Sequence, residues 1–285
     1  MKTVDVVVDD KAEISGKAAD SFSHGVLVQI YEIQTPGEAE AMIELGVNRL
    51  GSVLLSADSW KNRDIRKAIR ICENTGVKNS MIPLFDDADA VFRSADYYAP
   101  DILHFCETLT DAENHHTSDR IGRIMSLQEG FRRRFPEIII MRTIPVAPRG
   151  KGRHIPSLEW MRMFEPVSDC FLIDTFRLPD NETTSAVQPE NGFVGITGET
   201  CDWEKAAELA KESRIPVILA GGISPENVYE AVMSVQPAGV DSCTRTNAFD
   251  VRGNVIRFKK DPEKVRHLVS EVRRAVQEMP TRNTI

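Results

Sequence analysis

The chain has 285 residues, of which 41 % are hydrophobic and 27 % charged, and its formal net charge is −8. This apolar content is sufficient for a substantial core, and an α/β barrel commonly occupies about 250 residues as one domain. The acidic balance argues against a nucleic-acid-binding protein, because such proteins usually carry a basic surface patch.

Short β-branched runs alternate with segments of helical periodicity from about residue 25 onward, which indicates parallel strands joined by crossover helices. The expected strands are Val26–Tyr31, Arg49–Leu55, Ser80–Phe85, Asp101–Cys106, Ile138–Val146, Cys170–Asp174, Val217–Ala220 and Gly239–Ser242. The expected helices start at Pro36, cover Ile65–Cys72, Asp87–Tyr98, Ser118–Phe135, Ser157–Phe164 and Asp202–Ser213, and start again at Pro225 and at Asp261. Eight alternations predict a single (β/α)8 TIM barrel, and an open doubly wound sheet is disfavoured because no Gly-rich dinucleotide turn follows the first strand.

Two segments fall outside this alternation. Residues 1–24 are expected to form a short N-terminal extension, in which the run Val4–Val8 suggests an extra strand, and residues 25–285 form the barrel. The stretch Asn247–Lys260 contains Arg252-Gly253-Asn254 between two strand-like runs. A polar turn between two such runs predicts a small hairpin insert before the last helix.

A glycine pair follows the seventh strand, at the end of the barrel where the chemistry of such folds is located. The run Ala220–Val228 reads AGGISPENV. Gly221 and Gly222 allow a ligand to approach the backbone closely, and we expect Ser224 and Pro225 to open the next helix as N-cap and first residue. A helix N-terminus favours an anion, so this run predicts a phosphate site. The alternative interpretation is a strand-to-helix turn that merely needs glycine.

The last third of the chain resembles a known family in order and spacing. PVILAGGISPENVYEAV, GVDSCTRTN and KDPEKVRHLV are similar to the last quarter of phosphoribosylanthranilate isomerases, and FLIDT and GITGETCDW resemble their sixth strand and the loop after it. VQIYEIQTPGEAEAMIELGVNRLG and DILHFCE align more loosely with the first strand and helix and with the fourth strand. The resemblance covers residues 26–275 and is specific over 171–241.

This resemblance implies an aldose–ketose isomerase of tryptophan biosynthesis that performs an Amadori rearrangement on a phosphoribosylated aminobenzoate, with no cofactor and no metal. In the family, an acid on the sixth strand protonates the ring oxygen and a base on the first strand removes the C2 proton. Asp174 occupies the acid position, and burial at the barrel mouth can raise the pKa of a carboxyl enough for it to donate a proton near neutral pH. The resemblance also implies substrate contacts at Gly198, Gly221, Gly222, Ser224 and Asp241.

The first strand departs from the family. The family base is the cysteine of Lys-Ile-Cys-Gly, and this chain has Gln29-Ile30-Tyr31-Glu32. Tyr31 replaces the thiol, although a tyrosine with an ordinary pKa of about 10 is a poor base at neutral pH. Glu32 can serve instead if it points into the mouth, and Tyr31 can alternatively be a ring packed at the rim. Both are kept as catalytic candidates with Asp174.

Two anion contacts also depart from the family. Lys61, with Arg63 close by, stands near the position of an arginine that holds the substrate carboxylate. After the eighth strand the family has Ser-Gly, whereas this chain has Cys243-Thr244-Arg245. Thr244 can donate its hydroxyl and Arg245 a charge-assisted hydrogen bond to phosphate, unless the arginine fills the pocket itself.

The remaining polar residues give weaker signals. His104 is either a packed residue that lines the site or a base, and Glu107 is a second carboxylate candidate. The adjacent His115 and His116 do not share a helix face, so we expect no metal site from them with His154.

Targeting signals and cysteine pairs are not expected. Charges within the first ten residues argue against a signal peptide, and no run approaches the roughly 20 apolar residues of a membrane span. The five cysteines form no CxxC pair, which argues against a disulfide framework. We therefore expect a cytoplasmic monomer or homodimer that binds a small phosphorylated substrate and neither nucleic acid nor membrane. Two alternatives to the isomerase stay open: a lyase or epimerase with Glu32 or Glu107 as base, and a ligand-binding homologue that has lost catalysis.

Overall fold

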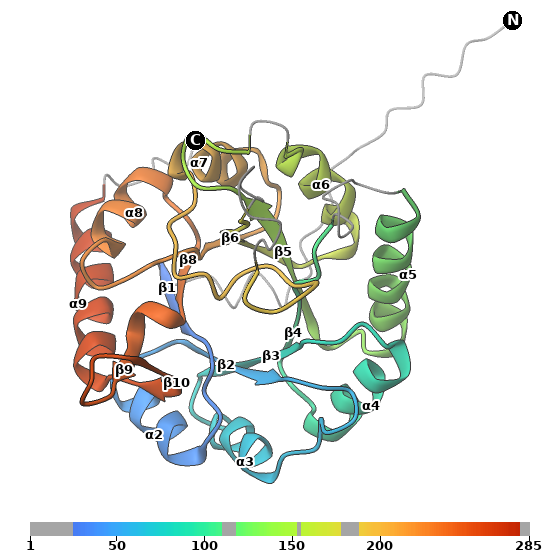
Figure 1. The fold of residues 1–285 in the computed structure, drawn as a ribbon, viewed down its shortest axis with the longest axis horizontal. Coiled ribbons are helices and arrows are strands. Elements are labelled where there is room, and N and C mark those ends of the chain that lie inside the picture. Colours follow the sequence, from blue (N-terminus) through green and yellow to red (C-terminus); the bar gives the residue numbers. More distant parts are fainter. Residues whose placement is uncertain (1–24, 110–117, 153–154, 178–187, 280–285) are drawn as a thin grey trace, which may run out of the picture.

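The computed structural model describes residues 25–109, 118–152, 155–177 and 188–279. Its central feature is a closed barrel of parallel strands in the order β1 to β8, with helices packed around the outside (Figure 1). The strands are β1 Leu27–Ile30, β2 Arg49–Leu54, β3 Lys78–Pro83, β4 Ile102–Phe105, β5 Ile139–Val146, β6 Cys170–Thr175, β7 Val217–Leu219 and β8 Gly239–Ser242. The helices are α2 Pro36–Glu44, α3 Arg63–Ile71, α4 Ala88–Tyr98, α5 Ser118–Arg134, α6 Ser157–Phe164, α7 Trp203–Glu212, α8 Val228–Val235 and α9 Pro262–Glu278.

The barrel closes between its first and last strands. Leu27 pairs with Gly239 and Ile30 with Ser242, in parallel register, so no strand edge of the barrel is left open. The strands are almost entirely buried, because helices cover the outside of the barrel and side chains fill its interior. This arrangement confirms the (β/α)8 barrel expected from the sequence.

Side-chain caps define where several helices begin. Asn62, Asp87, Asp202 and Asp261 each accept hydrogen bonds from backbone N–H groups of the first turn, which otherwise lack partners. The last helix is the clearest case, since Asp261 is followed by proline and the helix buries an apolar stripe facing the barrel. That stripe consists of Val265, Leu268, Val269, Val272 and Ala275.

The start of α8 differs from the expectation. The helix begins at Val228 rather than at Pro225, and Ser224 is not its N-cap. The Asn227 side-chain oxygen accepts a hydrogen bond from the Ser224 backbone amide at 2.8 Å, and the Asn227 backbone amide donates to the Ser224 carbonyl at 3.2 Å. These bonds close a tight turn over residues 225–227, so the helix N-terminus lies further along the chain than the capping pattern predicted.

The predicted hairpin insert is present and consists of β9 Asn247–Phe249 and β10 Val255–Lys260, which pair antiparallel. It lies beside α2 on the outside of the barrel (Figure 1). Residues 1–24, including the suggested strand Val4–Val8, lie outside the described residues. Among the described helices, none is long and apolar enough to cross a membrane.

Candidate functional site

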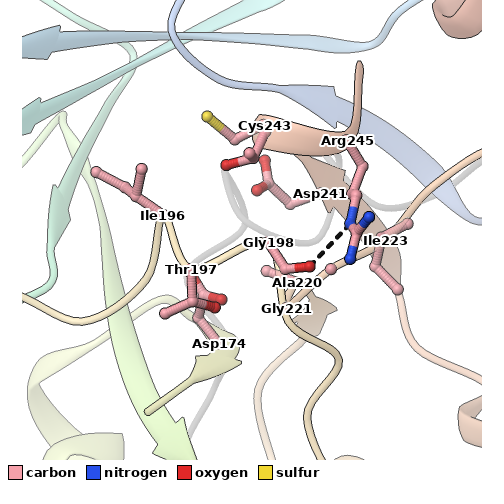
Figure 2. Close-up of a pocket in the computed structure, with 12 residues that line it drawn as sticks. Asp174, Ile196, Thr197, Gly198, Ala220, Gly221, Ile223, Asp241, Cys243 and Arg245 are labelled. Atoms are coloured by element: carbon pink, nitrogen blue, oxygen red, sulfur yellow. Dashed lines mark hydrogen bonds between the residues drawn. The ribbon is translucent and has the colours of Figure 1, made fainter. Parts of the chain in front are cut away.

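Two adjoining pockets open at the carboxyl ends of the strands. The glycine pocket is lined by the loops after β6, β7 and β8 and measures about 290 Å³ including the part open to solvent (Figure 2). The apolar pocket, about 450 Å³, lies over the barrel axis and is lined by Val53, Ile82, Leu84, Leu172 and Val194 together with polar residues described below. Asp174 and Asp241 line both pockets, so one ligand can contact both at once.

The glycine pair after β7 has a conformation that only glycine adopts without strain. Gly221 and Gly222 have φ values of 80° and 62°. A Cβ at Gly221 would lie 2.4 Å from the Thr175 hydroxyl, and one at Gly222 would lie 2.6 Å from the Glu199 carbonyl carbon. The loop after β7 therefore packs directly against the segment after β6, and bare backbone lines the pocket. The anion site and the alternative, a turn that merely needs glycine, both fit this geometry, and the anion site stays a prediction.

The loop after β8 forms the other wall of the glycine pocket. Arg245 donates from Nε to the Gly198 carbonyl at 2.8 Å, and its guanidinium group lies at the pocket (Figure 2). Thr244 also lines the pocket and lies against Gly198, where an added Cβ would be 3.4 Å from its methyl group. Arg245 is exposed, and it leaves space in the pocket rather than filling it. Ser224, which was expected here as well, does not line this pocket, because its amide is engaged by Asn227.

Two carboxyl groups face the pockets with raised pKa values. Burial raises the pKa of Asp174 to about 7, although the Thr175 amide, which donates to it at 2.7 Å, acts in the opposite direction. Burial also raises the pKa of Asp241 to about 8; the hydrogen bond from Gln29 opposes this shift, and the charge of Asp174 adds to it. Carboxyl groups that keep a proton near neutral pH can act as general acids.

Tyr31 and His104 belong to a buried hydrogen-bond network inside the barrel. The Tyr31 hydroxyl lies 2.6 Å from Ser80 Oγ and 2.8 Å from His104 Nδ1, and His104 Nε2 lies 2.6 Å from Thr143 Oγ1. Burial raises the pKa of Tyr31 well above 10, and burial and the Arg142 charge lower the pKa of His104 to about 3. Tyr31 therefore stays protonated, and the low pKa of His104 makes its neutral ring a weak base, although both residues line the apolar pocket.

The Tyr31 ring occupies the space beside Gly51. A Cβ at Gly51, on the neighbouring strand, would lie 2.0 Å from the Tyr31 ring. The ring is 3 % exposed, so it packs within the barrel rather than at an open rim. The bulky residue at the expected thiol position is thus a buried part of the site's floor.

Glu32 lies next to Tyr31 in a strained and buried conformation. Its φ is +64°, a region that costs a non-glycine residue about 1–2 kcal/mol, and the side chain is 1 % exposed. Oε1 accepts a hydrogen bond from Arg257 Nε at 2.7 Å, whereas Oε2 is buried and accepts no hydrogen bond from any described residue. Glu32 lines the apolar pocket together with Asp174. Glu32 thus borders the mouth of the barrel, and its role as a base stays a prediction.

Two sequence candidates are engaged elsewhere. Lys61 is not among the described residues that line either pocket; its ammonium lies over the rings of Trp60 and Tyr97, at 5.1 and 5.6 Å from their centres. Glu107 is paired with the fully buried Arg142 at 2.5 Å. Lys61 therefore does not border the pockets, where a contact with the substrate carboxylate was expected, and Glu107 is held by its ion pair with Arg142.

Metal ligands do not gather in the described part of the chain, where no group of three His, Cys, Asp or Glu residues is suitably placed. His115, His116 and His154 lie outside the described residues. Sequence patterns also missed Cys106, Cys243 and Ile196, which line the pockets, and Arg257, which contacts Glu32. A lone cysteine or a hairpin arginine carries no motif, so only the fold brings these residues to the site.

The comparisons with known proteins agree on one family. The family model described as N-(5'phosphoribosyl)anthranilate (PRA) isomerase matches residues 150–270. The chain is 36 % identical over 163 residues to N-(5'-phosphoribosyl)anthranilate isomerase 2 of Methanosarcina mazei, which covers 55 % of this chain and 63 % of that protein. It is 27 % identical over 250 residues to the isomerase of Methanothrix thermoacetophila, which covers 86 % of this chain and 97 % of that protein. With the first three curated relatives, the aligned parts span 63, 53 and 52 % of their lengths.

Solved structures support the fold. The N-(5'-phosphoribosyl)anthranilate isomerase of Pyrococcus furiosus superimposes with a TM-score of 0.59 at 17 % identity, covering 87 % of this chain and 99 % of that one. A thiamine phosphate pyrophosphorylase of the same organism reaches 0.54 at 13 % identity, so structural likeness by itself shows the barrel and not the reaction. The sequence matches show that the chain is similar to phosphoribosylanthranilate isomerases over residues 150–270 and, at lower identity, over most of its length.

Proposed function

We propose that this protein is an aldose–ketose isomerase that converts a phosphoribosylated aromatic amine, of which N-(5'-phosphoribosyl)anthranilate is the first candidate, into the corresponding 1-amino-1-deoxyketose. The observation that carries the proposal is Asp174, a carboxyl with a pKa of about 7 that faces both the glycine pocket and the apolar pocket. The names of the sequence relatives support the same reaction class.

The two pockets suit the two ends of such a substrate. The phosphate would lie against the backbone N–H groups near Gly221 and Gly222, with Thr244 and Arg245 on the opposite wall, because bare amides and a guanidinium group both bind phosphate oxygens. The aromatic amine would lie in the apolar pocket among Leu84 and its neighbours. The sugar ring would then span the boundary that Asp174 and Asp241 share.

Asp174 supplies the proton that opens the sugar ring in this proposal. A carboxyl that is half protonated near neutral pH can donate to the ring oxygen and accept a proton again within one cycle. Ring opening leaves a C1=N iminium group, which acidifies the proton on C2. A second group must then remove that C2 proton.

The test is turnover of N-(5'-phosphoribosyl)anthranilate by the purified full chain. The product is identified by mass spectrometry of fragments after borodeuteride reduction, which puts deuterium on C2 of the ketose and on C1 of the unreacted aldosamine. Asp174→Asn should lower kcat/KM by about 10²–10⁴-fold, the usual contribution of general acid–base catalysis. Asp64→Asn is the matched control, because Asp64 is exposed on α3, and it should leave kcat/KM unchanged.

The other functions are separate outcomes of the same assays. Equal rates for Asp174→Asn and the unchanged chain would contradict the role of Asp174. Turnover of other phosphosugars, but not of phosphoribosylated amines, would favour a lyase or epimerase. Tight binding of reduced 1-(o-carboxyphenylamino)-1-deoxyribulose 5-phosphate, the compound bound in one of the solved family structures, without any turnover would favour a ligand-binding homologue.

A further inference from the structure

The β9–β10 hairpin delivers a cation to the mouth of the barrel. Arg257 on β10 donates from Nε to Glu32 Oε1 at 2.7 Å and from Nη1 to Glu190 Oε1 at 2.7 Å. Its guanidinium group also stacks over the Phe258 ring, with its carbon 4.6 Å from the ring centre. Arg257 therefore connects the end of β1, which carries the candidate catalytic residue Glu32, to the segment after β6, which forms a wall of the site.

The hairpin is firmly anchored, so the position of Arg257 is built into the fold. Lys260, at the end of β10, is 4 % exposed and donates from Nζ to the Cys243 carbonyl at 3.0 Å. Its backbone amide donates to Glu38 of α2 at 2.9 Å. On the following helix, Lys264 donates to the Asn247 carbonyl at 2.8 Å. These bonds connect the hairpin to β8, α2 and α9.

Glu32 combines three features that are costly for folding alone. It has a left-handed backbone where glycine would be relaxed, its carboxylate is almost fully buried, and Oε2 accepts no hydrogen bond from the described residues. Strained and incompletely paired polar groups of this kind concentrate at functional sites. Because Glu32 shares the apolar pocket with Asp174, both carboxyl-bearing residues border the space that the substrate would fill.

We propose that Glu32 is the general base of the isomerisation and that Arg257 is the positioning residue that holds it, which together replace the thiol expected at the end of the first strand. This inference rests on the proposed function. Glu32 Oε2 takes the proton from C2 of the iminium form, and the C2–H electron pair forms the C1=C2 bond while the C1=N pair returns to nitrogen. The enolamine then gains a proton at C1 from Glu32 and loses the O2 hydroxyl proton to Asp174, so both carboxyls return to their starting states.

The rival bases are less suitable on geometry. Tyr31 is enclosed by hydrogen bonds to Ser80 and His104, and Glu107 is paired with buried Arg142. Arg257 contacts only one of the two Glu32 oxygens, which leaves the other for a proton. The Cys243 thiol after β8 also senses Glu32. Burial raises the pKa of this thiol, the Lys260 charge lowers it, and the Glu32 charge and a hydrogen bond with the Glu32 side chain raise it further.

The first experiment changes Glu32. Glu32→Gln should lower kcat by about 10²–10⁴-fold, with little change in the Kd of reduced 1-(o-carboxyphenylamino)-1-deoxyribulose 5-phosphate measured by calorimetry. It should also abolish exchange of the transferred proton with solvent deuterium. Glu32→Gly removes the backbone strain, so this variant should melt at the same or a higher temperature and still be inactive. That result separates loss of the base from loss of folding.

The second experiment changes Arg257. Arg257→Ala should lower kcat roughly 10–100-fold through misplacement of Glu32, and Arg257→Lys should recover part of this loss. The Kd of reduced 1-(o-carboxyphenylamino)-1-deoxyribulose 5-phosphate should stay unchanged, because Arg257 acts on Glu32 and not on the ligand. Arg252→Ala, in the exposed turn of the same hairpin, is the matched control and should leave both quantities unchanged.

Four results would overturn the inference. If Glu32→Gln keeps the kcat of the unchanged chain, Glu32 is not the base. An unchanged kcat in Arg257→Ala would exclude a positioning role for Arg257. Arg257→Ala could instead raise KM for N-(5'-phosphoribosyl)anthranilate, but not for the analogue without the carboxyl group, and leave kcat unchanged. That result would make Arg257 a ligand of the substrate carboxylate. If the unchanged chain turns over no phosphoribosylated amine, the proposed function fails and this inference falls with it; the other three results leave the Asp174 effect intact.

Discussion

Replacing Gly222 with alanine tests how closely the two halves of the glycine pocket pack. Gly222 has φ +62°, and a Cβ there would lie 2.6 Å from the Glu199 carbonyl carbon and 2.7 Å from the Thr200 nitrogen. Both are backbone atoms, so they cannot swing aside as a flexible side chain can. The left-handed conformation costs an alanine about 1–2 kcal/mol, and overpacking adds about 1–3 kcal/mol. Gly222→Ala should therefore destabilise the fold by about 2–5 kcal/mol.

Two other glycines provide matched controls for the same chemical change. Gly253 has φ +82°, and a Cβ there would have no atom within 4 Å, so Gly253→Ala isolates the conformational cost of about 1–2 kcal/mol. Gly37 lies in α2 without positive φ and also has open space, so Gly37→Ala should be neutral or stabilise by up to about 1 kcal/mol.

Chemical denaturation and thermal melting measure this series, and calorimetry with inorganic phosphate measures the pocket. For a chain of this size, each kcal/mol corresponds to roughly 2–4 °C in Tm. The expected order of stability is Gly37→Ala, then Gly253→Ala, then Gly222→Ala, with phosphate affinity reduced in the last alone. Equal stability of Gly222→Ala and Gly253→Ala would refute the close backbone contact and the pocket wall built on it.

Two further predictions concern buried charges. Glu107→Gln leaves Arg142 buried without its carboxylate and should lower the free energy of unfolding by about 3–5 kcal/mol. Glu204→Gln, in an exposed ion pair, is the control and should change the free energy of unfolding by less than about 1 kcal/mol. Comparable effects of the two variants in denaturant titrations would contradict this difference. Asp241 has a pKa of about 8 in the folded state, above the ordinary value for aspartate. Between about pH 4 and 8 the folded state therefore keeps a proton on Asp241 that the unfolded state has lost. The folded state loses stability as pH rises through this range, by up to about 1.4 kcal/mol per pH unit. Asp241→Asn lacks this loss, and its stability relative to the unchanged chain should increase from pH 5 to pH 8; a constant difference would rule out the raised pKa.

The alternation of strands and helices could be predicted from the sequence because it depends on local patterns. β-branched runs, apolar periodicity and cap residues such as Asp261 act within a few residues of one another. The glycine pair after β7 also carries its own signal, since positive φ and close backbone contact both demand glycine. The helix start at Pro225, with Ser224 as N-cap, was predicted wrongly: the Asn227 side chain binds the Ser224 backbone amide, and α8 begins at Val228.

The sequence by itself determined the alternation of strands and helices, the glycine pair and the position of Asp174 on the sixth strand, all of which follow from residues close in the chain. Only the tertiary structure decided how the end of β1 is used. Tyr31 is committed to Ser80 and His104 on other strands, and Glu32 meets Arg257, which is 225 positions away along the chain. Contacts between such distant residues depend on barrel closure and on the anchoring of the hairpin, and no local pattern encodes either.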